Sequence, residues 1–418
     1  MTARAWADRN FRRLWAGSSA SWFGAEIGEL ALPLLALITL SATPGELGVL
    51  RMMQFLPFLL VTLPVGVLVD RCRRRPLMIG ADLGRFVLIA AVPALVWLGA
   101  ARIELVYVLV FAATVLTVVY QLSDFAFLPR VVEPELLLDA NSKLTATQSA
   151  AEIGGKGLGG LLVQALTAPF AVLFNAAGYL LSAVAVARID VDEPVRRPPH
   201  RSARREVVEG IRIAVRNKYL RPLVAESTTY NLFFELFLVG LMVYTVRELG
   251  MSPALVGLAF TIGAAGTFLG AWFGARVAGR FGYGRVLLVT IFVGNTASVA
   301  LVLMNDQATA MTILSSVFFL MGLGTGIATV HATSLRQTVV PDALQGRVNA
   351  AYRMVSWGAV PIGAGLGGLI AGQYGARTAV LVGALGIPIG TVWIAASAIP
   401  RVRSIADVEP EPSPEAPR

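Results

Sequence analysis

Stretches of about 20 mostly apolar residues recur along the chain, and the short segments between them carry most of the arginines. A helix rises 1.5 Å per residue, so about 20 apolar residues are needed to cross a hydrocarbon core of roughly 30 Å. Twelve stretches fit this length, and they lie at residues 14–40, 46–69, 77–99, 103–128, 143–167, 169–189, 222–246, 253–275, 285–304, 309–334, 350–372 and 377–399. The hydrophobic pattern therefore predicts an all-α membrane protein with twelve transmembrane helices.

The composition agrees with a membrane protein, because 56% of the residues are hydrophobic and only 15% are charged. The first stretch is longer than the apolar core of a signal peptide, so we expect it to remain in the mature protein. The sequence has one cysteine, Cys72, and two histidines, His200 and His331, which predicts neither a disulfide framework nor a metal site. We find no nucleophile paired with a base and no nucleotide-binding loop, and we therefore expect no enzyme activity and no cofactor.

Lysines and arginines outside the twelve stretches alternate between the two sides of the predicted membrane. The N-terminal segment, every second connection and the C-terminal segment hold 28 of them, whereas the opposite connections hold only Arg102, Arg247 and Arg377. Positively charged loops are retained in the cytoplasm, so this alternation predicts a multi-pass protein of the cytoplasmic membrane with both termini inside. The same topology accounts for the net charge of +9, and we expect the lipid bilayer, and no nucleic acid, as a partner.

A long basic connection divides the twelve stretches into two sets of six. GLGGLL at 157–162 recurs 208 positions later as GLGGLI at 365–370, which indicates an internal repeat. Parallel repeats of this kind flank one substrate path, and we expect the protein to act as a monomer. The expected organisation is an N-terminal six-helix bundle at 1–189, a cytoplasmic linker with an amphipathic helix at 190–221, a C-terminal six-helix bundle at 222–400 and a disordered cytoplasmic tail at 401–418.

The segment between the second and third stretches, residues 66–75, reads GVLVDRCRRR. It resembles the loop 2–3 signature of the major facilitator superfamily, G-x-L-a-D-R-x-G-R-[RK], although Arg73 stands where a glycine is usual. The resemblance implies the major facilitator fold, with two six-helix bundles that transport by alternating access. Further runs look like the drug-efflux branch that contains macrolide and enterobactin exporters, and they are FRRLWAG at 11, ALP at 31, DLGR at 82, LPRVVEPELLLDAN at 128 and RQTVVPDALQGRVNAA at 336.

The branch resemblance implies proton-coupled efflux, by antiport, of a bulky amphiphilic small molecule such as a drug, a macrolide or a siderophore. The expected partners are thus a small-molecule substrate and protons. A proton-coupled uptake symporter would share nearly all of these features, and only the likeness to the efflux branch favours export. A membrane sensor or structural protein that transports nothing is a further alternative.

The motif residues are expected to form a gate at the cytoplasmic face. A carboxylate at the inner end of the second helix can pair with an arginine and a helix N-terminus while the two halves are closed on that side. By resemblance, Asp70 would stabilise the outward-open state in this way; alternatively, the arginines only retain the loop in the cytoplasm. The expected gate residues are Gly66, Asp70, Arg71, Arg74, Arg75, Asp82, Arg85, Asp124 and Arg353.

Two acids lie near the middle of the first stretch. An ionisable residue at this depth costs about 2.5–3.5 kcal/mol unless it is paired or faces water, so such residues indicate function. Glu26 and Glu29 share one helix face with Trp22, and both can therefore face the same cavity. This arrangement favours binding of the coupling proton by one or both acids. The alternative is a protonated acid that is hydrogen-bonded in helix packing.

The fifth stretch carries Gln148, Glu152 and Lys156 at intervals of four residues, and hence on one helix face. In the superfamily's antiporter motif, which resembles G-P-x-x-G-G, Lys156 stands in the place of the proline. One interpretation pairs Lys156 with Glu152, one turn away. The other brings Lys156 to an anionic group of the substrate, or to Glu26 or Glu29.

In the seventh stretch, Glu226 and Glu235 are nine residues apart and lie on opposite faces, so both cannot line one cavity. Glu235 lies deeper in the stretch and shares its face with Asn231, which favours Glu235. The expected proton-coupling and substrate-cavity residues are Trp22, Glu26, Glu29, Gln148, Glu152, Lys156, Asn231 and Glu235.

Overall fold

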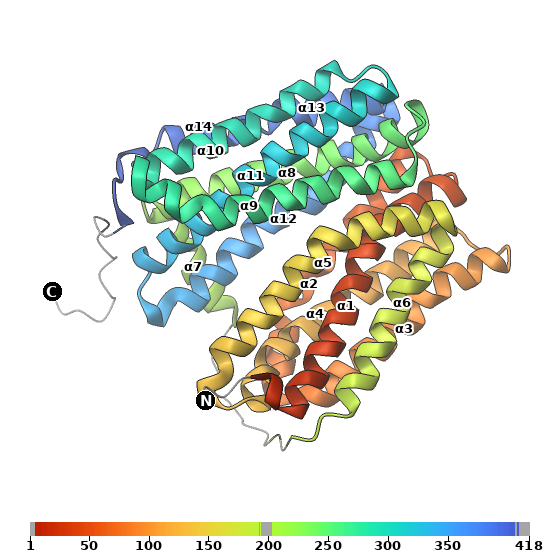
Figure 1. Cartoon of the computed structure of the whole chain (residues 1–418), viewed down its shortest axis with the longest axis horizontal. Coiled ribbons are helices and arrows are strands. Elements are labelled where there is room, and N and C mark those ends of the chain that lie inside the picture. Colours follow the sequence, from red (N-terminus) through yellow and green to blue (C-terminus); the bar gives the residue numbers. More distant parts are fainter. Residues whose placement is uncertain (1–4, 192, 194–202, 406–407, 409–418) are drawn as a thin grey trace. The chain divides into compact units, whose positions relative to one another are not determined.

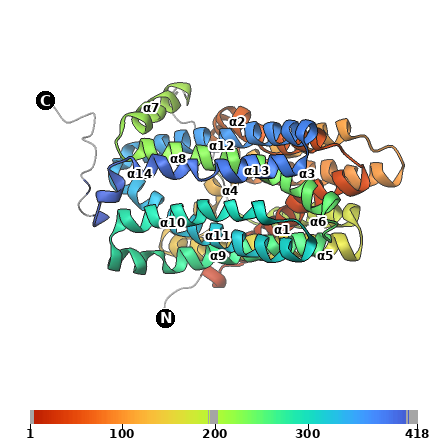
Figure 2. The same cartoon turned by 90° about the horizontal axis from the view of Figure 1, so that it is seen from above.

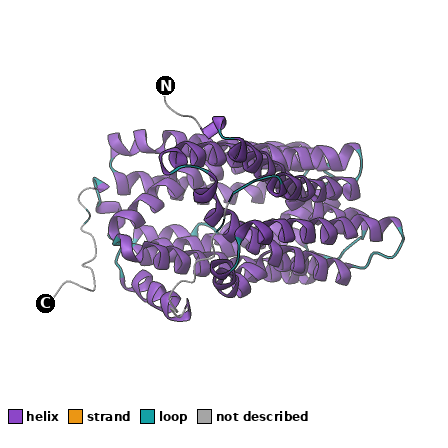
Figure 3. Ribbon diagram, turned by 90° about the horizontal axis from the view of Figure 1, so that it is seen from below, coloured by secondary structure: helices purple, strands orange, loops and turns teal. Residues whose placement is uncertain are grey.

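The computed structural model describes residues 5–191, 193, 203–405 and 408, except for the side chains of residues 70, 203–207, 275, 342 and 343. Every regular element in this part of the chain is a helix (Figure 3). The chain divides into two compact units. Unit 1 comprises Met1–His200 and Met251–Thr261, and unit 2 comprises Arg201–Gly250 and Ile262–Arg418.

Unit 1 is a bundle of long helices (Figure 1). Helix α1 packs against α5 and α6, α3 packs against α4 and α6, and α2 packs against α4. A buried apolar cluster that includes Phe11, Met78 and Phe127 fills one end of this bundle. The elements are η1 (Ala5–Ala7), α1 (Arg9–Leu34), the π-helical turn η2 (Leu35–Thr39), α2 (Pro44–Arg71), α3 (Arg74–Trp97), α4 (Ile103–Val131), η3 (Pro134–Leu136), α5 (Leu137–Ala165) and α6 (Ala168–Ala187).

Unit 2 is a second bundle, in which α8 packs against α12, α13 and α14, and α10 packs against α11 (Figure 2). Helix α9 crosses the division, because its residues up to Thr261 belong to unit 1. The elements are α7 (Ala203–Arg216), α8 (Leu220–Val243), the π-helical turn η4 (Tyr244–Glu248), α9 (Pro253–Phe281), α10 (Tyr283–Ala297), η5 (Ser298–Leu303), α11 (Gln307–Val339), α12 (Asp342–Tyr374), α13 (Ala376–Gly386), α14 (Ile389–Ala395) and η6 (Ile399–Arg401).

All twelve predicted stretches contain helix, but eleven helical segments of the described chain are long and apolar enough to be candidate membrane spans. The exception is α5, which has the necessary length, 29 residues, and carries Asp139, Lys143, Glu152 and Lys156. The last predicted stretch is also interrupted, because Pro388 lies between α13 and α14 and cannot donate a backbone hydrogen bond. The expected linker and tail fall in part on residues 192, 194–202, 406–407 and 409–418, which lie outside the described residues.

The repeated glycines make equivalent helix contacts in the two units. Gly159 of α5 packs against the backbone of Ile27 on α1, and Gly367 of α12 packs against the backbone of Leu236 on α8. A Cβ atom at Gly159 would lie 3.0 Å from the carbonyl oxygen of Ile27, so only glycine permits this approach without displacement. The internal repeat in the sequence therefore corresponds to a repeated helix pair, α1 with α5 and α8 with α12.

Candidate functional site

A cluster of charged side chains joins three helices of unit 1. Nζ of Lys156, on α5, lies 3.5 Å from Oε2 of Glu26 and 3.4 Å from Oε1 of Glu29, both on α1. Arg51 of α2 approaches the same carboxylate of Glu29, with 4.0 Å between Nη1 and Oε1. Two acids and two bases thus meet inside the bundle. Their charges balance when both glutamates are ionised, and protonation of either one leaves the cluster with a net positive charge.

The members of this cluster differ in exposure and in the number of their partners. The Arg51 side chain is 4% exposed, and it also donates to Oε1 of Gln54 and lies over the ring of Phe55. The side chains of Glu26 and Glu29 are 20% and 35% exposed, so both are more accessible than Arg51. Oε2 of Glu26 is buried and contacts Nζ of Lys156, whereas Oε1 of Glu29 contacts both Lys156 and Arg51. Glu26 is therefore the less constrained of the two acids.

Gly155 determines how closely α5 can bring Lys156 to α1. A Cβ atom at Gly155 would overlap the Cβ of Glu26, so a larger residue would force the two helices apart. Lys156 follows directly in the sequence, and its long side chain extends along the helix interface to the acids. Gly155, which precedes the repeated run at 157–162, thus positions the charged cluster.

The remaining residues predicted for this region lie at its edge. Gln148 and Glu152 are both exposed, and Nε2 of Gln148 donates to Oε1 of Glu152 over 3.2 Å. Trp22 is half-buried. Of the two interpretations of Lys156, the ion pairs favour the one that brings it to Glu26 and Glu29. Arg51 was not among the expected site residues, although its position inside an apolar stretch was a usable signal.

Two of the predicted gate arginines, Arg74 and Arg75, have partners in the last turn of α6 and in the segment that follows it. Arg74 lies 3.6 Å from Glu193, whose carboxylate also accepts hydrogen bonds from the backbone N–H groups of Arg74 and Arg75. The guanidinium of Arg75 donates to the carbonyl oxygens of Val186 and Ala187. Glu193 therefore caps the N-terminus of α3, a role that sequence reasoning did not find because 118 residues separate it from Arg75.

The other predicted gate residues have different surroundings. The side chain of Asp70 lies outside the described part of the structure. Arg71 and Arg353 are exposed, and Arg353 lies over the ring of Trp357. Gly66 has open space where a Cβ would be, so no steric contact explains it.

Asp82 and Arg85, two of the residues expected to support the gate, form an ion pair in the core of unit 1. Their side chains are 0% and 3% exposed. The guanidinium lies 4.3 Å from the ring centroid of Tyr120 and 4.2 Å from that of Tyr179. Asp124 is close enough to interact electrostatically with both members of the pair. Tyrosines on α4 and α6 thus enclose the cation, and sequence spacing could not predict this contact because it joins three helices.

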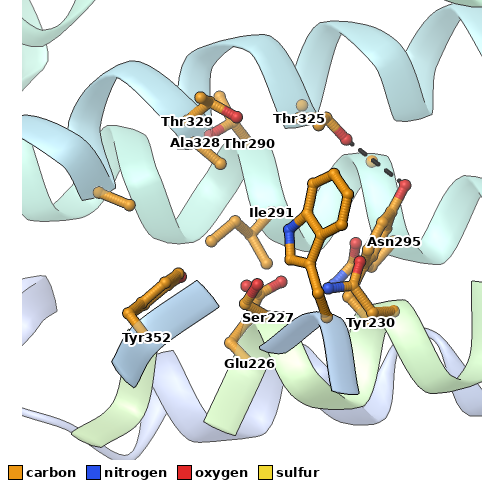
Figure 4. Close-up of a pocket in the computed structure, with 15 residues that line it drawn as sticks. Glu226, Ser227, Tyr230, Thr290, Ile291, Asn295, Thr325, Ala328, Thr329 and Tyr352 are labelled. Atoms are coloured by element: carbon orange, nitrogen blue, oxygen red, sulfur yellow. Dashed lines mark hydrogen bonds between the residues drawn. The ribbon is translucent and has the colours of Figure 1, made fainter. Parts of the chain in front are cut away.

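Unit 2 contains a cavity of about 280 Å³ between α8, α10, α11 and α12 (Figure 4). Glu226 is its acidic lining residue, and Asn295 provides that carboxylate with a neutral hydrogen-bond partner. Tyr230 and Thr325, also in the lining, hydrogen-bond to each other over 3.5 Å. The lining consists of Glu226, Ser227, Tyr230, Asn231, Thr290, Ile291, Gly294, Asn295, Gly324, Thr325, Ala328, Thr329, Ala332, Tyr352 and Trp357.

The acid that lines this cavity is not Glu235, which the sequence favoured in the seventh stretch. Glu226 lines the cavity, whereas Glu235 is 4% exposed and faces α12 beside Gly363. The close contact of α8 with α12 decides which face of α8 is covered. Asn231 does line the cavity, and its side chain donates to the carbonyl oxygen of Ser356 over 2.8 Å.

Comparison with known proteins identifies the family. Residues 14–364 match the Major Facilitator Superfamily. The chain belongs to the Major Facilitator Superfamily. This membership indicates a transporter and not an enzyme, and it agrees with a multi-span membrane protein that acts on small molecules.

Relatives within the superfamily cover nearly the whole chain. The chain is 25% identical to the uncharacterized MFS-type transporter YfiS of Bacillus subtilis (strain 168) over 398 residues, which is 93% of each chain. It is 24% identical to macrolide efflux protein A of Streptococcus pyogenes, over 87% of this chain and 90% of the relative. It is 26% identical to the multidrug efflux pump Tap of Mycolicibacterium fortuitum, over 86% and 88%. These similarities agree with the drug-efflux branch of the superfamily.

A solved structure shares the superfamily fold. The crystal structure of a bacterial homologue of the iron transporter ferroportin, in an inward-facing state, matches with a TM-score of 0.73 and covers 93% of this chain and 98% of that one. The sequence identity is 17%, so this likeness shows the fold alone.

Proposed function

We propose that the protein exports a bulky amphiphilic small molecule from the cell in exchange for protons, by alternating access of two helix bundles. The observation that carries the proposal is the cluster in which Lys156 lies between Glu26 and Glu29. Charged groups on apolar helices are retained where they face water or one another, and a carboxylate there can bind and release a proton. The similarity to efflux proteins supports the outward direction.

The proposal includes α5 as a twelfth transmembrane helix. Its 29 residues are sufficient to cross a bilayer. Ion pairs with Glu26 and Glu29 of α1 compensate the charge of Lys156. In this proposal, α5 is more polar than the other spans because one of its faces lies toward a solvated interior. With α5 included, six spans lie on each side of the 190–221 linker. The arrangement fits a monomer in the cytoplasmic membrane with both termini inside.

Transport into inverted membrane vesicles tests the proposal. An imposed acidic lumen should drive accumulation of the substrate in the lumen, because each proton that leaves is exchanged for substrate. Macrolides, lipophilic cations and siderophores are the substrates to test. An uptake symporter would instead carry substrate out of the lumen under this gradient, and a protein that only senses or supports structure would produce no flux.

The matched control is the double variant Glu26→Gln and Glu29→Gln, which keeps the shape of both side chains and removes their exchangeable charge. We expect it to lose gradient-driven accumulation. Retention of full gradient-driven flux by the double variant contradicts the assignment of the proton site to this cluster.

A further inference from the structure

The cavity of unit 2 combines one carboxylate with aromatic and neutral polar groups. Glu226 contributes the negative charge, and the aromatic side chains of Tyr230 and Tyr352 line the same space (Figure 4). Trp357 also belongs to the lining. Within the described part of the chain, no lysine, arginine or histidine forms an ion pair with Glu226. Its hydrogen-bond partner, the amide of Asn295, is neutral. An acid beside aromatic rings is a favourable environment for an organic cation.

Unit 1 also combines acids with aromatic rings, and there the cation is a side chain of the protein itself, Arg85. The guanidinium of Arg85 lies between the rings of Tyr120 and Tyr179 and pairs with Asp82, and all of these atoms belong to the helix core. The offset of 208 positions that defines the repeat relates Asp82, Tyr120 and Asp124 to Thr290, Ala328 and Ala332. All three of these counterparts line the unit 2 cavity.

The comparison explains why unit 2 has a cavity at this position. Unit 1 fills the space with two carboxylates and a tyrosine, whereas unit 2 has a threonine and two alanines there. Val293, which the same offset relates to Arg85, is 45% exposed and is not part of the lining, so α10 provides no counterpart of the guanidinium there. The acid of the unit 2 cavity, Glu226, comes instead from α8, where the offset relates it to Ser18 of unit 1.

Two arginines lie near the cavity without belonging to its lining. The guanidinium of Arg336 lies 3.9 Å from the ring centroid of Tyr352, and that of Arg353 lies 5.6 Å from the ring centroid of Trp357. Both rings therefore already accept a cation from outside the lining. The arginines oppose a second cation inside the cavity, so the affinity there depends on the negative charge of Glu226.

We propose that this cavity binds the protonated amine or quaternary ammonium group of an amphiphilic substrate, with Glu226 as its counter-ion. The inference rests on the proposed function and specifies the substrate class. A volume of about 280 Å³ is just below the range of drug-sized pockets, so the cavity receives the cationic head group and not the entire ligand.

The test uses a pair of probes that have the same shape and differ in charge, phenyltrimethylammonium and tert-butylbenzene. Both are titrated calorimetrically into the purified full-length chain in detergent micelles at neutral pH. We expect phenyltrimethylammonium to bind the unsubstituted protein at least about tenfold more tightly than tert-butylbenzene. Equal affinities of the unsubstituted protein for the two probes would overturn the inference.

Two variants locate the charge. Glu226→Gln should weaken binding of phenyltrimethylammonium by about tenfold or more and leave tert-butylbenzene unchanged, whereas Glu226→Asp should have an intermediate effect. The matched control is Glu104→Gln, the same change at an exposed position at the start of α4, and it should leave both affinities unchanged. Size-exclusion profiles verify that each variant is folded.

The outcomes separate this inference from the proposed function. If Glu226→Gln binds phenyltrimethylammonium as tightly as the unsubstituted protein, the head-group site is wrong, whatever the vesicle assay gives. If phenylphosphonate binds more tightly than phenyltrimethylammonium, Arg336 and Arg353 dominate the site and the inference is also wrong. If the cation binds through Glu226 but no proton-driven export is found, the binding site stands and the proposed function fails.

Discussion

Nζ of Lys156 lies 3.4 Å from Oε1 of Glu29, so an ion pair connects α5 to α1 in unit 1. Lys156→Met would leave Glu26 and Glu29 without the cation of α5. Breaking a fully buried pair costs about 3–5 kcal/mol, and solvent screening of these partly exposed side chains reduces the expected loss to about 1–3 kcal/mol. Thermal unfolding in detergent micelles measures the effect. Lys156→Arg is the charge-conserving control, and a Lys156→Met protein as stable as the unsubstituted one contradicts this role.

The two acids of the cluster should respond differently to neutralisation. Glu29→Gln removes the carboxylate that contacts both Arg51 and Lys156, whereas Glu26→Gln removes the one that contacts Lys156. We expect Glu29→Gln to lower Tm more than Glu26→Gln. We expect Glu26→Gln to reduce gradient-driven export by about tenfold or more, because it removes the less constrained proton acceptor. The reverse order in both measurements would assign the proton to Glu29 instead.

Gly155→Ala tests whether close packing of α5 on α1 positions Lys156. The added Cβ overlaps the Cβ of Glu26, and overpacking of this kind costs about 1–3 kcal/mol. We expect lower Tm together with weaker export. Gly80→Ala is the matched control, because no atom lies within 4 Å of a Cβ there and alanine favours the exposed helix by up to about 1 kcal/mol. Equal behaviour of the two variants contradicts the packing argument.

Glu193→Ala tests the cap at the start of α3. The carboxylate accepts from the N–H of Arg74 over 2.7 Å and from that of Arg75 over 3.2 Å, and it is 6% exposed. Loss of a cap costs about 0.5–2 kcal/mol, so Tm should fall. The control is Glu133→Ala, an exposed glutamate without a side-chain cap, for which we expect a change within about 0.5 kcal/mol. Equal Tm values for the two variants would show that the cap contributes nothing measurable.

Asp306 caps α11 at a connection outside the spans, and its contribution depends on pH. Hydrogen bonds from the backbone and hydroxyl of Thr309 lower the pKa of Asp306 below its usual value. Because the pKa of Asp306 is lower in the folded state than in the unfolded state, its ionised form stabilises the fold. This contribution to the free energy of unfolding is complete above about pH 4, and it is lost as the pH falls through the folded-state pKa. The Tm difference between Asp306→Ala and the unsubstituted protein should thus be constant near neutral pH and shrink in acid. A Tm difference between the two proteins that grows in acid would contradict this prediction.

The hydrophobic pattern predicted the helices well because span length and apolarity are local properties. The recurrence of GLGGLL as GLGGLI located the repeat, whose glycines make equivalent contacts on α1 and α8. The pattern overestimated the regularity of the spans, since α5 is too polar to qualify by hydropathy and Pro388 interrupts the last stretch. Charges on α5 that looked anomalous in the sequence are explained by their partners on a different helix.

The sequence by itself determined the helical membrane class and the superfamily, because apolar lengths and short motifs do not depend on which helices are neighbours. Only the tertiary structure decided that Lys156 pairs with Glu26 and Glu29, that Glu193 caps α3, and that Glu226 lines the cavity. The physical reason is that 3.6 residues per turn relate the faces of one helix to each other. Helix packing alone selects which face meets which neighbour.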